Sequence, residues 1–236
     1  MRVAVLGTGV VGRTLAGGLA ARGHDVVVGT RDPSVTAERH LEGDAGPTWA
    51  DWLEGASEVG LATFAQAAAD ADLVLNAASG DASIAVLLSA GEDNLTRKVL
   101  LDVANPLDFS RGFPPFLSVC NEDSLAERIQ RTFPEAKVVK SLNTVNYALM
   151  VNPPAGATMF VSGDDEAAKA TVGGLLRDLG WTSIADLGDL SGARGQEMYL
   201  ALWVRVMSAL GTAGFSMSLT MPDGSTVGVG NSQERP

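Results

Sequence analysis

The chain has 236 residues, 46% of them hydrophobic, which is enough to bury one large core, or a large and a small one, and excludes general disorder. Its net charge of −11 argues against nucleic acids and anionic membranes as partners. A single cysteine and two histidines exclude an internal disulfide framework and are too few for a convincing metal site, so we expect no bound metal.

The first thirty residues carry a strand, a glycine-rich turn, a helix and a second strand in succession. The pattern predicts a strand over 3–6, a helix over 13–21 and a strand over 26–28. In this context Gly7 permits a tight turn, Gly9 lets the backbone approach a pyrophosphate, and Gly12 packs the helix on the strand. The free N–H groups at the start of the helix then hold the phosphates. The sequence therefore predicts a dinucleotide site that includes Gly7, Thr8, Gly9, Val10, Val11 and Gly12.

The end of the second strand indicates which dinucleotide binds. Sites for NAD usually place an acidic residue there for the ribose 2′-hydroxyl, whereas an arginine suits a 2′-phosphate. This chain has Thr30 and Arg31, and only then Asp32. A hydroxyl and a guanidinium favour a phosphate through charge-assisted hydrogen bonds, so we predict NADP. Two alternatives stay open: Asp32 turns inward and selects NAD, or Arg31 is a solvated loop charge paired with Asp32.

Strands and helices alternate along the rest of the first 147 residues. The pattern predicts helices over 33–41, 49–53, 64–71, 82–90 and 124–132, and strands over 59–62, 73–75, 99–103 and 137–140. Ser124 and Glu127 have the spacing of a capping box at the start of the last of these helices. Alternation of this kind is typical of α/β proteins, so we predict a doubly wound parallel Rossmann sheet with right-handed crossovers.

In such a sheet, ligands bind outside the carboxyl ends of the strands. Three predicted strands end in residues that could line a cofactor cleft, namely Asn76, Ala77, Ala78 and Ser79; Ala104 and Asn105; and Asn143 and Thr144. The small side chains of the first group leave room for a flat ring, and the Asn105 carboxamide can bond a nicotinamide or a hydride acceptor. We predict all of these except Thr144 as cofactor-binding, and Asn105, Asn143 and Thr144 as the catalytic set. Because Asn105 precedes Pro106, an ordinary turn is the alternative for it.

A change of region follows residue 147, where two consecutive prolines occur. The pattern then predicts a strand over 159–161, a helix over 165–179, a strand over 182–185 and a long apolar helix over 191–210. We therefore expect an NADP-binding Rossmann domain over 1–147, a small C-terminal α/β region over 148–221 that completes the cleft, and a flexible tail over 222–236. The apolar last helix and the aromatic segment 110–118, a lid or a subunit contact, predict a homodimer.

The expected location follows from composition. No apolar run approaches the roughly 18 residues that a membrane-spanning helix needs. The first predicted strand starts at residue 3, which leaves no room for a signal peptide, and the lone Cys120 fits a reducing compartment. We therefore expect a cytoplasmic protein without membrane contact.

Several stretches of the chain resemble the NADPH-dependent oxidoreductases of the deazaflavin coenzyme F420 and their bacterial relatives. They are VGTRDP, NPLDFS, VVKSLNTV, the SGDD before a helix, and DLGDLSGARGQEMYL. The same stretches are similar to the cytosolic NADPH-binding domain of the membrane ferric reductases called STEAP. The resemblance covers about residues 1–215, and SLNTV and the S-x-A-R before the last helix are its most specific parts.

The resemblance implies where cofactors bind. It implies NADPH at Thr8, Gly9, Val10 and Val11, with Thr30 and Arg31 at the 2′-phosphate. It also implies the nicotinamide near Ala77, Ala78, Asn105 and Asn143, with coenzyme F420 stacked across it. Two departures concern this second cofactor and not the dinucleotide. Ala77-Ala78-Ser79 stands where enzymes proven on the deazaflavin often have a bulkier Ile-Pro-Trp type stretch, and Asn143-Thr144 stands where they can carry a His-Thr pair.

The expected reaction is hydride transfer between NADP(H) and a flat acceptor such as coenzyme F420. This reaction needs two stacked rings in a dry slot and little acid–base machinery. An NADPH-dependent imine or carbonyl reductase is the alternative, in which Asp102, Asp108, Tyr147, Lys140 or water would donate a proton. A non-catalytic NADP-binding sensor with a blocked cleft is a third possibility from a different class.

Overall fold

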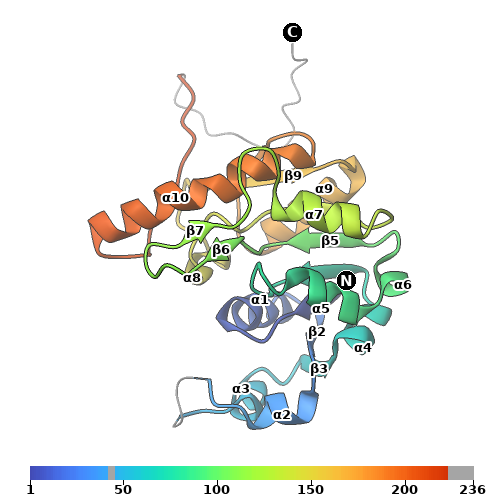
Figure 1. Cartoon of the computed structure of the whole chain (residues 1–236). Helices are drawn as coiled ribbons and strands as arrows, with labels where there is room; N and C mark the ends of the chain where they lie inside the picture. Colours follow the sequence, from blue (N-terminus) through green and yellow to red (C-terminus); the bar gives the residue numbers. More distant parts are fainter. Residues whose placement is uncertain (42–45, 223–236) are drawn as a thin grey trace.

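The computed structural model describes residues 1–41 and 46–222, and its centre is an eight-stranded sheet (Figure 1). The strands are β1 (Arg2–Leu6), β2 (Asp25–Thr30), β3 (Val59–Thr63), β4 (Leu73–Asn76), β5 (Val99–Asp102), β8 (Lys137–Lys140), β9 (Thr158–Gly163) and β10 (Ser183–Asp186). Their order in the sheet is β10-β9-β8-β5-β4-β1-β2-β3. All pairs from β3 to β8 are parallel, which confirms the predicted doubly wound sheet.

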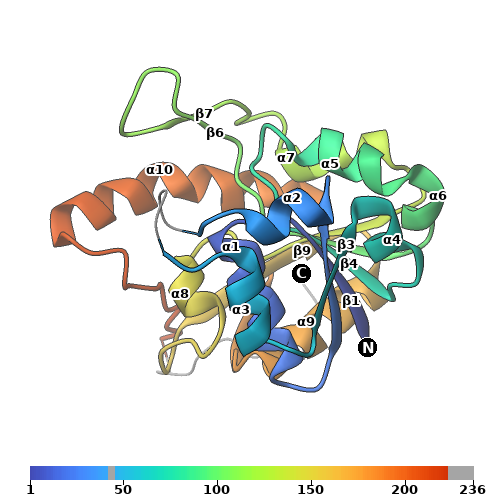
Figure 2. The same ribbon diagram turned by 90° about the horizontal axis from the view of Figure 1, so that it is seen from below.

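Helices cover both faces of this sheet. They are α1 (Val10–Ala20), α2 (Pro33–Glu38), α3 (Trp49–Gly55), α4 (Phe64–Ala69), α5 (Ser83–Ala90), α6 (Glu92–Leu95), α7 (Leu125–Thr132), α8 (Tyr147–Met150), α9 (Glu166–Asp178) and α10 (Ala193–Leu210), the last preceded by a 3₁₀ turn, Leu190–Gly192. Figure 2 shows α1, α8 and α9 on one side of the strands and α4, α5 and α7 on the other. No helix among the described residues is long and apolar enough to cross a bilayer.

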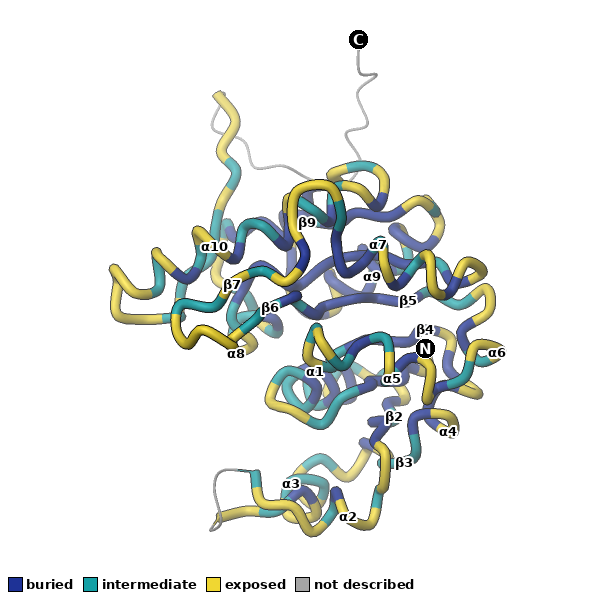
Figure 3. Tube along the Cα trace, in the orientation of Figure 1, coloured by how far each residue is buried: buried dark blue, intermediate teal, exposed yellow. Residues whose placement is uncertain are grey.

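The alternation of side chains along the strands creates two cores. In β1, Val3 and Val5 pack in the cluster that contains the buried residues of α1 and α9, whereas Ala4 and Leu6 pack in the cluster of α4, α5 and α7. Successive side chains of a strand point to opposite faces, so a strand covered on both sides is apolar throughout. Figure 3 shows two such strands, β4 and β5, buried along most of their length.

The turn between β1 and α1 is closed by backbone contact. A Cβ added to Gly12 would lie 2.0 Å from the carbonyl oxygen of Gly7, so only glycine lets the helix come this close to the strand. Gly7 itself has a φ of 136°, a region that other residues rarely adopt. The helix begins at Val10, with Gly9 as its N-cap, three residues earlier than the apolar pattern indicated.

The region after residue 147 extends the same sheet. Strand β9 pairs antiparallel with β8, and β10 pairs parallel with β9, so both run opposite to the other six strands. Helix α10 then crosses the sheet, and its C-terminal half projects beyond the sheet edge in two views (Figures 1 and 2). The aromatic segment forms a small hairpin of β6 (Leu107–Asp108) and β7 (Phe116–Leu117), where the sequence indicated only a loop. The predicted tail, 222–236, lies outside the described residues except for Pro222.

Candidate functional site

The order of the sheet places a crevice at the carboxyl ends of β1 and β4. These neighbours are followed by helices on opposite faces, α1 and α5, so the chain diverges on either side of them. Such a switch point is where ligands bind in open α/β sheets. Two cavities of about 560 and 760 Å³ lie here, and both are lined by Ala77, Ala78 and Ser79. The turn after β4 is a wall of both, so we treat them as two parts of one cleft and call them the phosphate end and the ring end.

The phosphate end lies against the start of α1. It is lined by Gly7, Thr8 and Gly9, and no side chain caps the helix N-terminus at Gly9. A Cβ on Gly9 would meet nothing within 4 Å, so this stretch of backbone faces open space. Free N–H groups with a partial positive charge, facing a cavity, are suited to a pyrophosphate.

The residues after β2 lie at the far wall of the phosphate end. The Asp32 carboxylate accepts hydrogen bonds from the N–H groups of Ser34 and Val35, at 2.9 and 3.2 Å, and so caps α2. Hydrogen bonds from Ser34 and Val35 lower the pKa of Asp32, so it stays ionised on the helix. Arg31 has no ion pair or hydrogen bond with the residues that the structure describes, and its side chain is free to meet a ligand. Asp32 therefore neither turns into the cleft to select NAD nor pairs with Arg31.

A second guanidinium in this cavity, that of Arg39, was not indicated by the sequence. Its Nη2 donates to the carbonyl oxygen and the hydroxyl of Thr8, at 3.1 and 2.9 Å. The indole N–H of Trp49 donates to the same carbonyl oxygen at 3.1 Å. Arg39 is the C-cap residue of α2, and its contact with the glycine-rich turn joins residues that are 31 positions apart in sequence. The only feature of the sequence that could have indicated Arg39 as part of the site was its positive charge within ten residues after β2.

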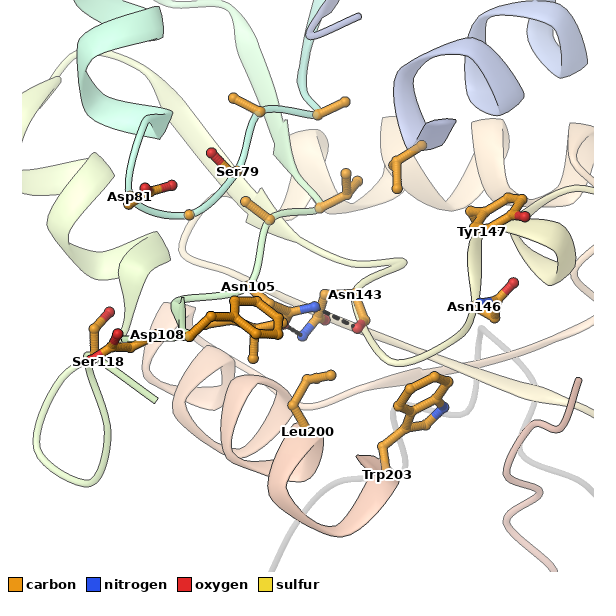
Figure 4. A pocket seen from close by; sticks show the side chains of 18 of the residues that line it. Ser79, Asp81, Asn105, Asp108, Ser118, Asn143, Asn146, Tyr147, Leu200 and Trp203 are labelled. Atoms are coloured by element: carbon orange, nitrogen blue, oxygen red, sulfur yellow. Dashed lines mark hydrogen bonds between the residues drawn. The ribbon is translucent and has the colours of Figure 1, made fainter. Parts of the chain in front are cut away.

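The ring end has a polar floor made of two amides (Figure 4). Asn105 donates to the backbone oxygen of Asn143 at 2.9 Å, and Asn143 donates to the side-chain oxygen of Asn105 at 2.9 Å. Asn143 also donates to the backbone oxygen of Gln196 in α10, at 3.0 Å. The side-chain oxygen of Asn143 is buried without a partner. The two predicted residues therefore do meet at the cleft, and one acceptor there is unsatisfied.

Other walls of the ring end come from parts of the chain that are far apart in sequence. The turns after β4 and β5 supply Ala77–Asp81 and Val103–Asn105, the hairpin supplies Leu107–Ser110, and α1 supplies Val11. Tyr147 and Met150 come from α8, and Leu200 and Trp203 from α10. Leu200 and Trp203 lie on one side of the amide pair, and Ser79 and Asp81 lie on the other (Figure 4).

Four predicted residues do not line either cavity: Asn76, Thr144, Val10 and Gly12. The expectation that Thr144 faces the cleft is corrected: its hydroxyl lies 4.0 Å from the sulfur of Met159, in the core. The cause is Leu142, whose φ of 61° turns the chain sharply between β8 and Thr144. Asn76 is fully buried and donates to the carboxylate of Asp102, at 2.8 Å, so it supports the cleft from below.

A buried ion cluster underlies the ring end. The ammonium of Lys140 lies 2.7 Å from the carboxylate of Asp102 and 2.9 Å from that of Glu197, and it also donates to the Ala104 carbonyl oxygen. Glu197 in turn accepts from the backbone N–H of Leu125 at the start of α7, at 2.8 Å. Burial disfavours the charge of Lys140, but attraction from Asp102 and Glu197 outweighs it and raises the pKa of the ammonium. Burial also raises the pKa of Glu197, against the attraction of Lys140.

This cluster corrects the set of possible proton donors. Lys140 and Asp102 are completely buried and bonded to each other, so neither can reach a molecule in the cleft. Of the four side chains named from the sequence, only Asp108 and Tyr147 line the ring end.

Comparison with known proteins decides the family. A family model described as NADP oxidoreductase, coenzyme F420-dependent, matches residues 2–106. The crystal structure of a proposed F420-dependent NADP reductase from Arthrobacter sp. FB24 is 54% identical, has a TM-score of 0.89, and covers 94% of this chain and 100% of its own. The chain belongs to this family of NADP oxidoreductases. The resemblance noted in the sequence and the prediction of NADP as the dinucleotide are thereby confirmed.

Two further relatives of this NADP oxidoreductase are more distant. Metalloreductase STEAP3 of Rattus norvegicus is 32% identical over 198 residues, which are 83% of this chain. The chain spans only 36% of the length of that curated relative. A reductive aminase from Aspergillus terreus in complex with NADPH has 19% identity and a TM-score of 0.62, and the match covers 88% of this chain and 62% of that one. At this identity, the likeness shows the fold alone.

Removing the central cation of the oxidoreductase should be strongly destabilising. We expect Lys140→Met to lower the free energy of unfolding by about 3–5 kcal/mol, because two buried carboxyl groups lose their counter-ion. Burial already raises the pKa of Glu197, and loss of the attraction of Lys140 would raise it further above its unfolded value, so the loss should be larger at pH 8 than at pH 6. Urea unfolding at both pH values measures this. Lys137→Met, which removes a partly exposed pair with Asp165, should change stability by less than about 1 kcal/mol. Equal losses in the two variants would contradict the role given to the cluster.

Proposed function

We propose that this NADP oxidoreductase transfers a hydride between NADP(H) and a flat acceptor, coenzyme F420. The observation that carries the proposal is the shape of the site: a phosphate end next to a ring end of about 760 Å³, with the small side chains of the turn after β4 between them. That space suits two stacked rings, and hydride transfer needs little beyond their alignment and the exclusion of water. The similarity to the proposed F420-dependent NADP reductase of Arthrobacter, at 54% identity, supports the same acceptor.

We propose the following residues as the NADP site. The start of α1, with Thr8, Gly9 and Val11, suits the pyrophosphate, and Arg31 and Arg39, beside Thr30, suit the 2′-phosphate. The unpartnered Asn143 oxygen and the Asn105 carboxamide suit the nicotinamide carboxamide, whose N–H groups need acceptors. The bound dinucleotide supplies the hydride, and the protein supplies binding and alignment.

We further propose that the region 148–221 completes the acceptor side. Leu200 and Trp203 of α10 and Met150 of α8 line the ring end only, and none of them lines the phosphate end. The acceptor ring would lie on this side, away from the turn shared by the two cavities. Cytoplasmic location is part of the proposal, because both NADPH and the single thiol of Cys120 are at home in a reducing compartment.

The two other functions have less support. An imine or carbonyl reductase needs a proton donor at the acceptor, and two of the four candidate side chains are buried in the ion cluster. Its structural relatives are similar at the level of fold alone. A non-catalytic sensor would need a blocked cleft, whereas the side chains that the structure describes leave the ring end open.

The 2′-phosphate assignment is tested with paired variants. We expect Arg31→Ala to weaken NADPH by about 10- to 150-fold, the equivalent of 1.5–3 kcal/mol for one charge-assisted contact, and to leave NADH within about two-fold. Arg39→Ala should weaken both dinucleotides, because Arg39 also holds the Thr8 turn. Arg177→Ala on the exposed face of α9 is the control. Calorimetric titration that showed equal losses of NADH and NADPH for Arg31→Ala would contradict the assignment.

The acceptor is tested by turnover. We expect the protein to oxidise NADPH with coenzyme F420, which is measured as the loss of deazaflavin absorbance. We expect no oxidation of NADPH with cyclic imines. Tyr147→Phe should keep turnover within about two-fold, because this transfer does not depend on a side-chain acid. A loss of about 10²- to 10⁴-fold in that variant, together with turnover of imines, would instead favour the imine or carbonyl reductase.

We also propose a homodimer formed through the projecting half of α10 and the aromatic hairpin. Leu202 on α10 is 56% exposed, and Phe113 between β6 and β7 is 62% exposed. Light scattering at micromolar concentration should give twice the chain mass of 24.4 kDa. Leu202→Glu should shift the mass toward the monomer, whereas Leu88→Glu, equally exposed at 57% but on α5, should not. A monomer in the unaltered protein would overturn the proposal.

A further inference from the structure

The two ends of the cleft carry opposite charges. Arg31 and Arg39 line the phosphate end, where the only carboxylate, Asp32, is engaged in capping α2. Asp81 and Asp108 line the ring end, and no lysine, arginine or histidine occurs among the described residues that line it. The charged side chains that line the site are therefore mainly positive at the phosphate end and negative at the ring end.

Both ring-end carboxylates lie on the same side of the cleft (Figure 4). The backbone N–H of Ser110 donates to Asp108 at 2.8 Å. The hydrogen bonds from Ser110 and the attraction of Arg111 hold the pKa of Asp108 below its usual value, so it is ionised at neutral pH. The guanidinium of Arg111 itself lies outside the lining, 5.0 Å from the ring centroid of Phe116. Asp81 is exposed at the mouth of the cleft.

The floor adds no positive charge to this end. The side-chain oxygen of Asn143, a residue that lines the cleft, is buried and has no hydrogen-bond partner, so its partial negative charge is not compensated by a protein donor. Beneath the floor, two carboxyl groups, Asp102 and Glu197, face a single ammonium, that of Lys140. The unpartnered oxygen of Asn143 and the excess of carboxyl groups beneath the floor suit a ligand with N–H donors, and they also favour a positively charged ring.

We propose that Asp81 and Asp108 make the ring end bind the positively charged nicotinamide of NADP⁺ in preference to the neutral ring of NADPH. The inference rests on the proposed function, which assigns the nicotinamide to this end. When the oxidised form binds more tightly than the reduced form, bound NADPH becomes a stronger hydride donor than free NADPH. Asp81 and Asp108 then favour transfer from NADPH to the acceptor over the reverse direction.

The transfer is balanced without a further reactant. The C4–H bond of the dihydronicotinamide breaks, and two electrons and one proton pass together to the acceptor, while the acceptor takes its second proton from water. As the bond breaks, positive charge develops on the nicotinamide and negative charge passes to the acceptor, so a carboxylate stabilises the transition state where it lies nearer the nicotinamide than the acceptor.

The test compares the affinities of the two redox states. Calorimetry would give Kd for NADP⁺, for NADPH and for 2′-phospho-ADP-ribose, which lacks the nicotinamide, in Asp81→Asn, Asp108→Asn and the double variant. Each substitution should lower the ratio of the NADPH Kd to the NADP⁺ Kd by about two- to four-fold, and the double variant by about 5- to 15-fold. Added salt should shrink these changes, because the carboxylates are near solvent.

The matched control is Asp93→Asn. Asp93 is an exposed residue of α6, which precedes β5 and lies away from the carboxyl ends of the strands (Figure 1). It should leave the ratio of the two Kd values unchanged. The ring-less nucleotide reports how far the loss of a carboxylate relieves repulsion of the phosphates, which is common to all three ligands, so only the ratio reports the ring.

The outcomes separate the two levels of the argument. Unchanged ratios in Asp81→Asn and Asp108→Asn, with normal binding of both redox states, would overturn this inference and leave the proposed function intact. An equal shift in Asp93→Asn would also overturn it, because net charge and not position would then be the cause. A protein that binds none of the three nucleotides would overturn the NADP site itself.

Discussion

The ammonium of Lys140 is the charge on which the geometry of the cleft depends. It is fully buried, and it stays charged there because carboxylates from β5 and α10 surround it. One of these, Glu197, also accepts a hydrogen bond from the first N–H group of α7. Lys140 thus joins its own strand, β8, to β5 and α10, and Glu197 extends the link to α7. A buried cation is a costly way to join elements, but its directional contacts specify how α10 crosses the sheet.

The cluster positions the cleft through residues that are close in sequence to its members. Lys140 also donates to the carbonyl oxygen of Ala104, and the next residue, Asn105, is part of the polar floor. Three residues beyond Glu197 on α10, Leu200 forms part of the opposite wall. The floor that suits the nicotinamide and the wall that suits the acceptor are therefore positioned by the same cluster. The charge in the cleft above the cluster has a separate origin, namely the carboxylates at the mouth of the ring end and the arginines at the phosphate end.

The parts of the fold that local patterns determine could be predicted from the sequence. The turn from β1 to α1 is one example, because the contact that requires glycine at Gly12 is with the backbone of Gly7, only five residues earlier. The direction of β9 is a counter-example: apolar residues mark it as a strand, but its antiparallel pairing with β8 depends on a long connection and leaves no local signature. For the same reason the sequence did not show that β9 and β10 extend the first sheet.

The candidate site divides in the same way. Strand ends predicted the amide floor, but Arg39 and Glu197 reach their partners across folded loops and helices, and Thr144 is turned into the core by a single left-handed residue before it. The open space in the ring end is related to a contact between two neighbouring turns. A Cβ on Gly80 would lie 2.2 Å from the carbonyl oxygen of Asn105, so the turns after β4 and β5 meet backbone to backbone. This backbone contact fixes the position of one side of the cleft. The side chains beside it are small, so they leave open space there. The positions of the opposite walls depend on contacts between residues that are far apart in the sequence.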